Sequence, residues 1–389
     1  MKPKIITPEL SIRYKKIQTA LADCGADACL ISTNINMLFV AGRVLNGYCY
    51  VPVVGNPVFF IRRPVGIEVD TVYPIRKPEQ IIELLQQIGM PLPRHLLVEA
   101  GEITHLDFLR LEQAMKAKKT GDCTQLLRQV RATKTSFEIE LLKESARLQS
   151  EMFTELPSLY RQGMTDTDLA IAVEQSLRKK GCVPTLRIFG STMEGGIVCV
   201  WAGENAATPS PYDFSLGGAG ISAYPVGDNG TLLTQGMAVM IDTGCNVNGY
   251  IADQTRTFSI GKLAQKAYAM HQVSLEIHHQ LIDFVVPGIT AEMVYQKAMQ
   301  LVDAHNLRHC FMGTVQQAPF VGHGVGLVVN ELPVLCDRNT MCIEEQMVLA
   351  IEPKFIVEGV GAVGVENTYI VRKNGLEKIT LAPEDIIAL

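Results

Sequence analysis

The stretch that decides the fold runs Met237-Ala-Val-Met-Ile-Asp-Thr-Gly-Cys-Asn-Val-Asn-Gly-Tyr-Ile-Ala-Asp-Gln-Thr-Arg-Thr257. Its first five residues are apolar and β-prone, and Gly244, Asn248 and Gly249 provide turn residues before a second β-prone run. These features predict a β-hairpin.

The hairpin carries two aspartates, Asp242 and Asp253, which lie eleven positions apart. Neighbouring strands can place both carboxylates on one face of the sheet. An isolated Asp beside Gly or Asn is typically a hydrogen-bonding turn residue. The pair in this setting instead indicates a metal site.

Three further candidate ligands follow along the chain. His323 stands in Val321-Gly-His-Gly-Val-Gly-Leu327, where glycines on both sides let the backbone approach a ligand closely. Glu352 and Glu366 lie in or at the ends of apolar runs predicted to be strands. A carboxylate in such a position is costly to bury unless it is paired or bound to metal.

The five candidate ligands carry a formal charge of −4 at neutral pH, which is strongly self-repelling in one cleft unless cations are present. Two divalent ions would balance it. The set therefore indicates a dinuclear metallohydrolase, in which two metals activate one bridging water and polarise the group it attacks. Oxygen ligands with one nitrogen favour Mn²⁺, Co²⁺, Zn²⁺ or Fe²⁺.

The composition is that of an ordinary globular protein, with 389 residues, 47% apolar and 19% charged. This length is natural for two domains. The formal charge of −5 gives no electrostatic reason to expect nucleic acid or an anionic membrane as a partner. The first nine residues are too polar for a signal peptide, so we expect a cytoplasmic location.

The ten cysteines show no regular spacing, which fits a reducing compartment. Cys245 is close to Asp242 in sequence, where it is either a turn residue or a metal-sensitive thiol.

Residues 1–130 are expected to form an α/β domain. Its predicted elements are a helix over 8–24, strands over 28–32, 48–54, 57–62 and 96–99, and helices from Pro78 and Thr104. The second and third strands are expected to pair as a hairpin around Gly55-Asn56. Residues 131–389 are expected to form the second domain, which should open with a long amphipathic helix from Ser136 to Gln162, capped by Ser136. The segments 189–196 and 202–220 are rich in Gly, Pro and Ser, and they predict loops that form either a pocket wall or a disordered linker.

These motifs resemble the metallopeptidase family that contains methionine aminopeptidase, Xaa-Pro aminopeptidase and Xaa-Pro dipeptidase. The resemblance rests on the ordered segments Asp242-Thr-Gly, Asp253-Gln-Thr-Arg-Thr, His323-Gly-Val-Gly-Leu, Ile351-Glu-Pro and Val365-Glu-Asn-Thr. It implies a "pita-bread" catalytic domain over 131–389. Residues 13–39 resemble the creatinase-type N-terminal domain of the proline-specific branch.

The resemblance also implies a role for each ligand. Asp253 and Glu366 would bridge both metals, Asp242 would chelate one of them, and His323 and Glu352 would bind the other. Glu352 would in addition be the catalytic proton acceptor for the metal-bound water. A peptide or small-molecule substrate is implied. So is a homodimer, with the N-terminal domain of one chain near the active-site mouth of the other.

The sequence departs from the proline-specific members at three imidazoles that hold the substrate carbonyl and the tetrahedral intermediate. Val226, Pro319 and Asn330 stand in their places, and losing one such donor typically costs ~10²–10³ in rate. Gly364 occupies a place where Arg is common. Tyr224 and Asn330 are the candidate substrate contacts, with Asp228, Asn229 and His309 as further possible donors.

Three function classes remain open at this point. The first is a dinuclear metal exopeptidase for short peptides, of the Xaa-Pro aminopeptidase or dipeptidase kind. The second is a hydrolase of another C–N bond, as in creatinase, which lacks a metal centre. The third is a pita-bread binding module with weak catalysis or none.

Overall fold

The computed structural model describes residues 8–67, 69 and 71–389, and the chain divides into two compact units, residues 1–131 and 132–389. The boundary predicted from the sequence, between residues 130 and 131, is one residue before the boundary in the structure. The segment Met1 to Thr7, on which the signal-peptide argument partly rested, lies outside the described residues.

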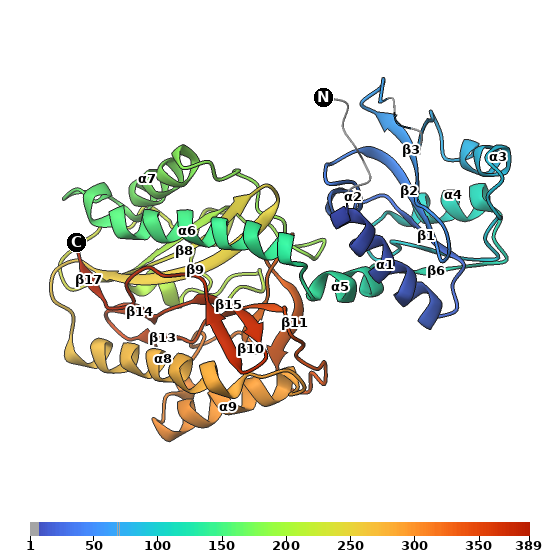
Figure 1. Cartoon of the computed structure of the whole chain (residues 1–389). Coiled ribbons are helices and arrows are strands. Elements are labelled where there is room, and N and C mark those ends of the chain that lie inside the picture. The colour runs from blue at the N-terminus through green and yellow to red at the C-terminus, as the bar shows by residue number, and fades with distance from the viewer. Residues whose placement is uncertain (1–7, 68, 70) are drawn as a thin grey trace. The chain divides into compact units, whose positions relative to one another are not determined.

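The first unit is a six-stranded mixed sheet with helices, in the order β4-β3-β2-β1-β5-β6 (Figure 1). The predicted antiparallel pair around Gly55-Asn56 is confirmed as β2 and β3. The strands are β1 (Ala28–Ile31), β2 (Asn46–Pro52), β3 (Val58–Arg63), β4 (Val72–Pro74), β5 (His95–Val98) and β6 (Lys119–Asp122). The helices are α1 (Pro8–Asp23), α2 (Asn34–Ala41), α3 (Gln80–Gln87), α4 (His105–Met115) and α5 (Thr124–Ala132).

The second unit holds two larger sheets, ordered β17-β9-β8-β7 and β11-β10-β12-β15-β16, and the two-stranded pair β13-β14. The strands of the first sheet are β7 (Val198–Ala202), β8 (Ala238–Val247), β9 (Tyr250–Ser259) and β17 (Ile387–Ala388). The others are β10 (Phe320–Gly324), β11 (Glu331–Cys336), β12 (Val348–Ile351), β13 (Lys354–Val357), β14 (Gly361–Gly364), β15 (Asn367–Arg372) and β16 (Gly375–Lys378).

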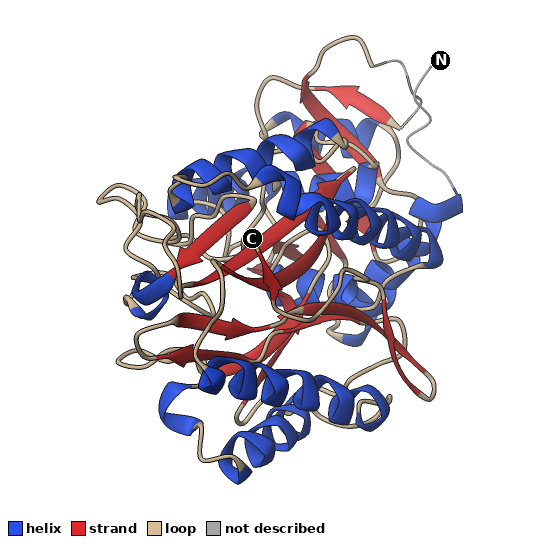
Figure 2. Cartoon of the chain, turned by 90° about the vertical axis from the view of Figure 1, so that its left-hand side faces the viewer, coloured by secondary structure: helices blue, strands red, loops and turns tan. Residues whose placement is uncertain are grey.

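Helices cover the strands of this unit from two sides, as Figure 2 shows. One apolar core joins α6 and α7 to the β7–β9 sheet, and a second joins α8 and α9 to β10–β16 and also includes residues of β7 and β8. The α-helices are α6 (Ser136–Leu159), α7 (Asp166–Lys179), α8 (Gln265–Phe284) and α9 (Ala291–Ala304), and the 3₁₀ turns are η1 (Gly203–Ala207) and η2 (Arg308–Cys310). The predicted α/β class in two parts is confirmed.

The hairpin prediction is also confirmed, because β8 and β9 pair antiparallel along their whole length. The turn residues Asn248 and Gly249 have φ of 51° and 95°, the left-handed region that Asn and Gly tolerate best. Gly244 and Cys245 were expected in a turn, and this was wrong: both lie within β8, and Cys245 is fully buried opposite Ala252.

Two helix starts differ from the prediction. Thr135, not Ser136, caps α6: its hydroxyl accepts from the Glu138 amide, and the Glu138 carboxylate accepts from the Thr135 amide. This reciprocal capping box leaves Ser136 as the first helical residue. Helix α3 begins at Gln80, two residues after Pro78.

Candidate metal centre

The strands of the second unit bring all five predicted ligands into one region. Asp242 lies opposite Thr255 in the hairpin, and Asp253 lies opposite Gly244, so the two aspartates occupy diagonal positions on one face. Ile351 lies opposite Asn367 where β12 pairs with β15. Glu352 and Glu366, the neighbours of that pair, therefore leave their strands at the same edge.

Hydrogen bonds tie the hairpin to the strands that carry the glutamates. The Thr368 hydroxyl donates to the Asp253 carbonyl and accepts from the Asp253 amide, and the Glu366 amide donates to the Thr255 carbonyl. The guanidinium of Arg256 donates to the Glu366 carbonyl and to Asn367 Oδ1. These bonds fix the backbone on which Asp253 and Glu366 stand.

The glycines beside His323 leave no room for side chains between the neighbouring strands. A Cβ at Gly322 would lie 2.1 Å from the carbonyl oxygen of Ala350, and one at Gly324 would lie 2.1 Å from that of Leu332. The two glycines therefore let β10 carry His323 between the flanking strands β12 and β11.

The oxygen and nitrogen atoms of the site form two groups, each within 4.8 Å, that share Glu366. The first consists of Asp253, His323 and Glu366, and the second of Asp242, Glu352 and Glu366. In the first group, His323 Nε2 lies 3.9 Å from Asp253 Oδ2; it is also 3.3 Å from Glu352 Oε1.

Lys354 is a further charged residue of the site, and the sequence analysis missed it. Its fully buried Nζ lies 2.7 Å from Glu352 Oε2, 3.1 Å from Glu366 Oε2 and 3.2 Å from Asp242 Oδ2. The sequence does contain a signal for this lysine, because it stands in the apolar run that follows Glu352-Pro353. A lysine in a buried run is usually paired with carboxylates, which indicates a partner nearby.

The ammonium and the imidazole change the acidity of the carboxyl groups around them. Burial favours the neutral form of Glu352, yet Lys354 and His323 hold its pKa at about 2. Burial, followed by repulsion from Glu352, raises the pKa of Glu366 to about 8. Burial, followed by repulsion from Glu366 and Asp242, raises the pKa of Asp253 well above its usual range. The Lys354 ammonium alone therefore does not offset the repulsion among Asp253, Glu366 and Asp242.

Both groups have the ligand types that divalent ions bind, and the first also offers a carboxylate oxygen without a partner among the described residues. Glu366 Oε1 is buried without a hydrogen-bond partner in the described part of the chain. His323 Nδ1 lies 3.1 Å from the Gly324 carbonyl, which would accept a hydrogen bond from Nδ1 when Nε2 binds a metal in place of its present contact with Glu352 Oε1. In the second group, all three carboxylates already contact the Lys354 ammonium. A second ion in this group would compete with Lys354 for these oxygens.

The predicted substrate contacts are engaged within loops. Asn330 accepts from the Phe189 amide at 2.7 Å and donates to the Phe189 carbonyl at 2.9 Å. The Tyr224 hydroxyl accepts from the Gly196 amide at 2.5 Å. Val226 is buried and Pro319 is exposed, and neither offers a side-chain donor. Gly364 has no room for a side chain, since a Cβ would lie 2.5 Å from the Pro353 carbonyl oxygen.

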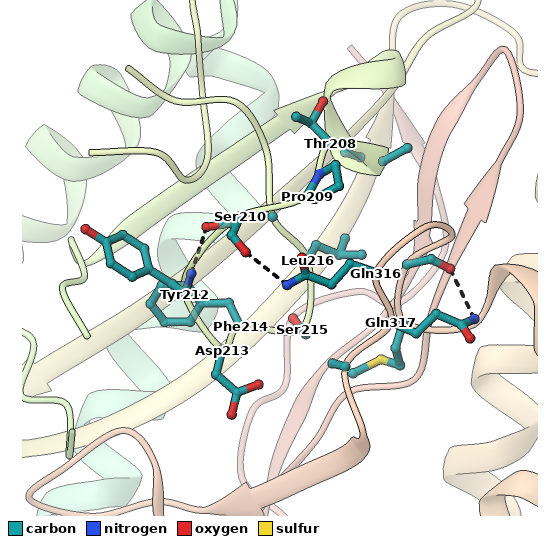
Figure 3. Close-up of a pocket in the computed structure, with 16 residues that line it drawn as sticks. Thr208, Pro209, Ser210, Tyr212, Asp213, Phe214, Ser215, Leu216, Gln316 and Gln317 are labelled. Carbon is teal, nitrogen blue, oxygen red and sulfur yellow. Dashed lines mark hydrogen bonds between the residues drawn. The ribbon is translucent and has the colours of Figure 1, made fainter. Parts of the chain in front are cut away.

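The loop predicted as a pocket wall packs in part against residues 312–318. Figure 3 shows this contact, where the Gln316 side chain donates to the Ser210 carbonyl at 2.9 Å. The cavity between the two segments measures about 40 Å³, room for little more than a water molecule. Ser215 lines it and also accepts from Lys354 Nζ at 2.8 Å, so the loop closes over the lysine.

Comparison with known families decides what kind of site this is. Residues 140–373 match the model of metallopeptidase family M24, and residues 13–133 match the Creatinase/Prolidase N-terminal domain. The chain belongs to metallopeptidase family M24. This membership supports a hydrolase that acts on peptides, and it implies divalent metal.

Relatives of this M24 chain include a putative dipeptidase, YkvY, of Bacillus subtilis, 28% identical over 76% of the chain and 73% of the relative. The Xaa-Pro dipeptidase of Pyrococcus furiosus is 20% identical over 96% of the chain and 99% of the relative. Among solved structures, the Xaa-Pro dipeptidase from Bacillus anthracis superposes with a TM-score of 0.80 at 21% identity, covering 98% and 100% of the two chains. The predicted pita-bread fold with a creatinase-type N-terminal domain is thereby confirmed.

None of the helices among the described residues of the M24 chain is long and apolar enough to cross a membrane.

Proposed function

We propose that this M24 chain is a metal-dependent exopeptidase that hydrolyses short peptides, of the Xaa-Pro aminopeptidase or dipeptidase kind. The observation that carries the proposal is the convergence of Asp242, Asp253, His323, Glu352 and Glu366 on one buried site. The relatives named as Xaa-Pro dipeptidases support the substrate class.

A divalent ion at Asp253, His323 and Glu366 would polarise the scissile carbonyl and make water more acidic. Mn²⁺, Co²⁺, Zn²⁺ and Fe²⁺ are all compatible with one imidazole and carboxylate oxygens. The Gly324 carbonyl, 3.1 Å from His323 Nδ1, would hold the metal-bound ring in the tautomer that binds through Nε2. Glu352, whose Oε1 faces His323, would accept the proton of the attacking water.

Activity is expected to be slower than in relatives that keep the three auxiliary imidazoles. Val226 and Pro319 offer no donor, and both polar ends of the Asn330 amide bind the Phe189 backbone. One lost donor typically costs ~10²–10³ in rate. Lys354 adds to the effect, because a carboxylate that an ammonium holds ionised is a weaker base.

A panel of dipeptides and tripeptides with and without proline at the second position, assayed with Mn²⁺, Co²⁺ and Zn²⁺, tests the proposal. We expect slow, metal-dependent turnover that falls by ~10²–10⁴ in Glu352→Gln. Glu345→Gln, a change at an exposed position, is the matched control and should leave the rate unchanged. Absence of peptide turnover in metal-loaded protein would sink the proposal and favour another C–N hydrolase or a binding module.

A homodimer and a cytoplasmic location are parts of the proposal that rest on family resemblance and composition. Sedimentation equilibrium at micromolar concentration measures the first, and a monomer there would contradict it.

A further inference from the structure

Lys354 is held in the centre of the candidate metal site by four oxygen atoms. Besides the carboxylates of Asp242, Glu352 and Glu366, its Nζ contacts the Ser215 hydroxyl at 2.8 Å. The side chain is fully buried, and its Nζ lies 5.8 Å from the centre of the Trp201 ring. Oxygen donors, an aromatic face and burial together leave the ammonium no route to solvent without opening the loop that carries Ser215.

The three carboxylates that Lys354 contacts are the members of one of the two groups able to hold a cation. The ammonium therefore stands where a second divalent ion would stand. A divalent ion in this group would compete with the Lys354 ammonium for the same three carboxylates, and two cations so close together would repel each other.

Glu366 belongs to both groups of ligands, and its two carboxylate oxygens have different surroundings. Its Oε2 accepts from the Thr255 hydroxyl at 2.7 Å and from Lys354 at 3.1 Å. Its Oε1 is buried and has no hydrogen-bond partner among the described residues. A buried, unpartnered carboxylate oxygen is costly, and it belongs to the residue that both groups share.

The formal charges agree with one ion. The four carboxylates contribute −4 and Lys354 contributes +1, which leaves −3 with a neutral imidazole. One divalent ion reduces this to −1. The remaining ligands for it are a carboxylate, an imidazole nitrogen and the free oxygen of Glu366, a donor set suited to Mn²⁺, Co²⁺, Zn²⁺ or Fe²⁺.

We infer that Lys354 permanently replaces one of the two cations, so that each chain binds a single divalent ion, held by Asp253, His323 and Glu366. The inference rests on the metal site of the proposed function but not on peptide turnover. It revises the expectation of two ions, and it assigns Asp242 to the lysine and not to a metal.

Metal counting tests the inference directly. The 389-residue chain is stripped of metal with a chelator, dialysed against excess Mn²⁺ and analysed for bound metal. Mn²⁺ is chosen because cysteine thiols bind it weakly, so the ten cysteines should not add to the count. Wild type should hold about one equivalent per chain. Lys354→Ala, which frees both space and charge, should hold about two, while Lys266→Ala, at an exposed lysine on α8, should stay at one. Two equivalents in wild type, fewer than half, or one in folded Lys354→Ala would each overturn the inference.

A second pair of variants keeps the test decisive if Lys354→Ala fails to fold. Asp242→Asn should retain one equivalent and weaken Mn²⁺ binding by about tenfold at most. This is the smallest loss of affinity that is typical when a residue next to the metal ligands, but not itself a ligand, is changed. His323→Asn should lose the ion. Loss of metal in Asp242→Asn equal to that in His323→Asn would contradict the assignment. Peptide assays on the same preparations separate the two claims, since one bound ion without turnover sinks only the proposed function.

Discussion

His278 shows how a residue outside the ligand set supports the site. It is buried on α8, its Nε2 lies 3.1 Å from the Val365 carbonyl, and its Nδ1 lies 2.9 Å from the Tyr369 hydroxyl. The ring therefore holds the backbone immediately before Glu366. Both ring nitrogens have partners suited to the neutral form, in which Nε2 donates and Nδ1 accepts.

The neutral form of His278 makes stability depend on pH. Burial lowers its pKa from 6.5 to about 4, so between these values the unfolded chain binds a proton that the folded chain does not. Stability is thus fully present above pH 6.5 and falls as the pH drops toward 4. The loss is about 3 kcal/mol from this group.

Urea unfolding at pH 7 and pH 4.5 measures this dependence, with His278→Gln as the reference because its amide does not titrate. We expect wild type to lose more unfolding free energy than the variant over this interval. Equal losses would show that His278 does not remain neutral in the folded chain.

Single residues also mark the limit of sequence reasoning. The positions of Asp242, Asp253, His323, Glu352 and Glu366 could be predicted because each stands in a local motif, and the structure brings them together. The contacts of Lys354 could not, since they depend on which way β13 turns its side chains after Pro353. The different surroundings of the two Glu366 carboxylate oxygens, one hydrogen-bonded to Thr255 and Lys354 and the other without a partner among the described residues, likewise arise only from tertiary contacts.

At the scale of elements, the start of α6 is set by a capping box. The Thr135 hydroxyl satisfies the Glu138 amide, an N-terminal donor that has no partner within the helix. Ser136, the neighbouring hydroxyl residue, is exposed and already helical.

We expect Thr135→Ala to lower the free energy of unfolding by about 1 kcal/mol, whereas Ser136→Ala should change it by a few tenths at most. Parallel urea denaturation of the two variants measures the difference. If Ser136→Ala proved the more damaging, the cap would be misplaced by one residue.

The hairpin and the loops differ in how far their sequences define them. The β8-β9 hairpin was predictable because its strands pair with each other around a local Asn-Gly turn. The segments on either side of β7 are held by distant partners instead, such as the Asn330 side chain at Phe189 and the Trp201 indole of β7 at the Gly217 carbonyl. Their composition predicts loops, but only tertiary contacts decide where these loops lie.

For the whole molecule, metal binding should be coupled to folding, because Asp253, His323 and Glu366 come together only in the folded second unit. At free Mn²⁺ 100-fold above the dissociation constant, the stabilisation is about 2.7 kcal/mol. For a unit of this size it corresponds to a rise in melting temperature of roughly 5 to 10 °C.

Calorimetry with Mn²⁺ and with EDTA measures this shift, and Asp253→Asn serves as the control that should melt at one temperature in both conditions. An identical melting temperature of wild type in both conditions would contradict a site assembled by folding.

Lys354 also bears on how the chain is made. Its positive charge is covalently part of the polypeptide, whereas a metal ion must be acquired after translation. A newly synthesised chain therefore folds with Asp242, Glu352 and one oxygen of Glu366 already paired, whatever the supply of metal in its surroundings. Under metal starvation such a protein should persist as a folded, ion-free reserve that becomes competent as soon as one ion arrives.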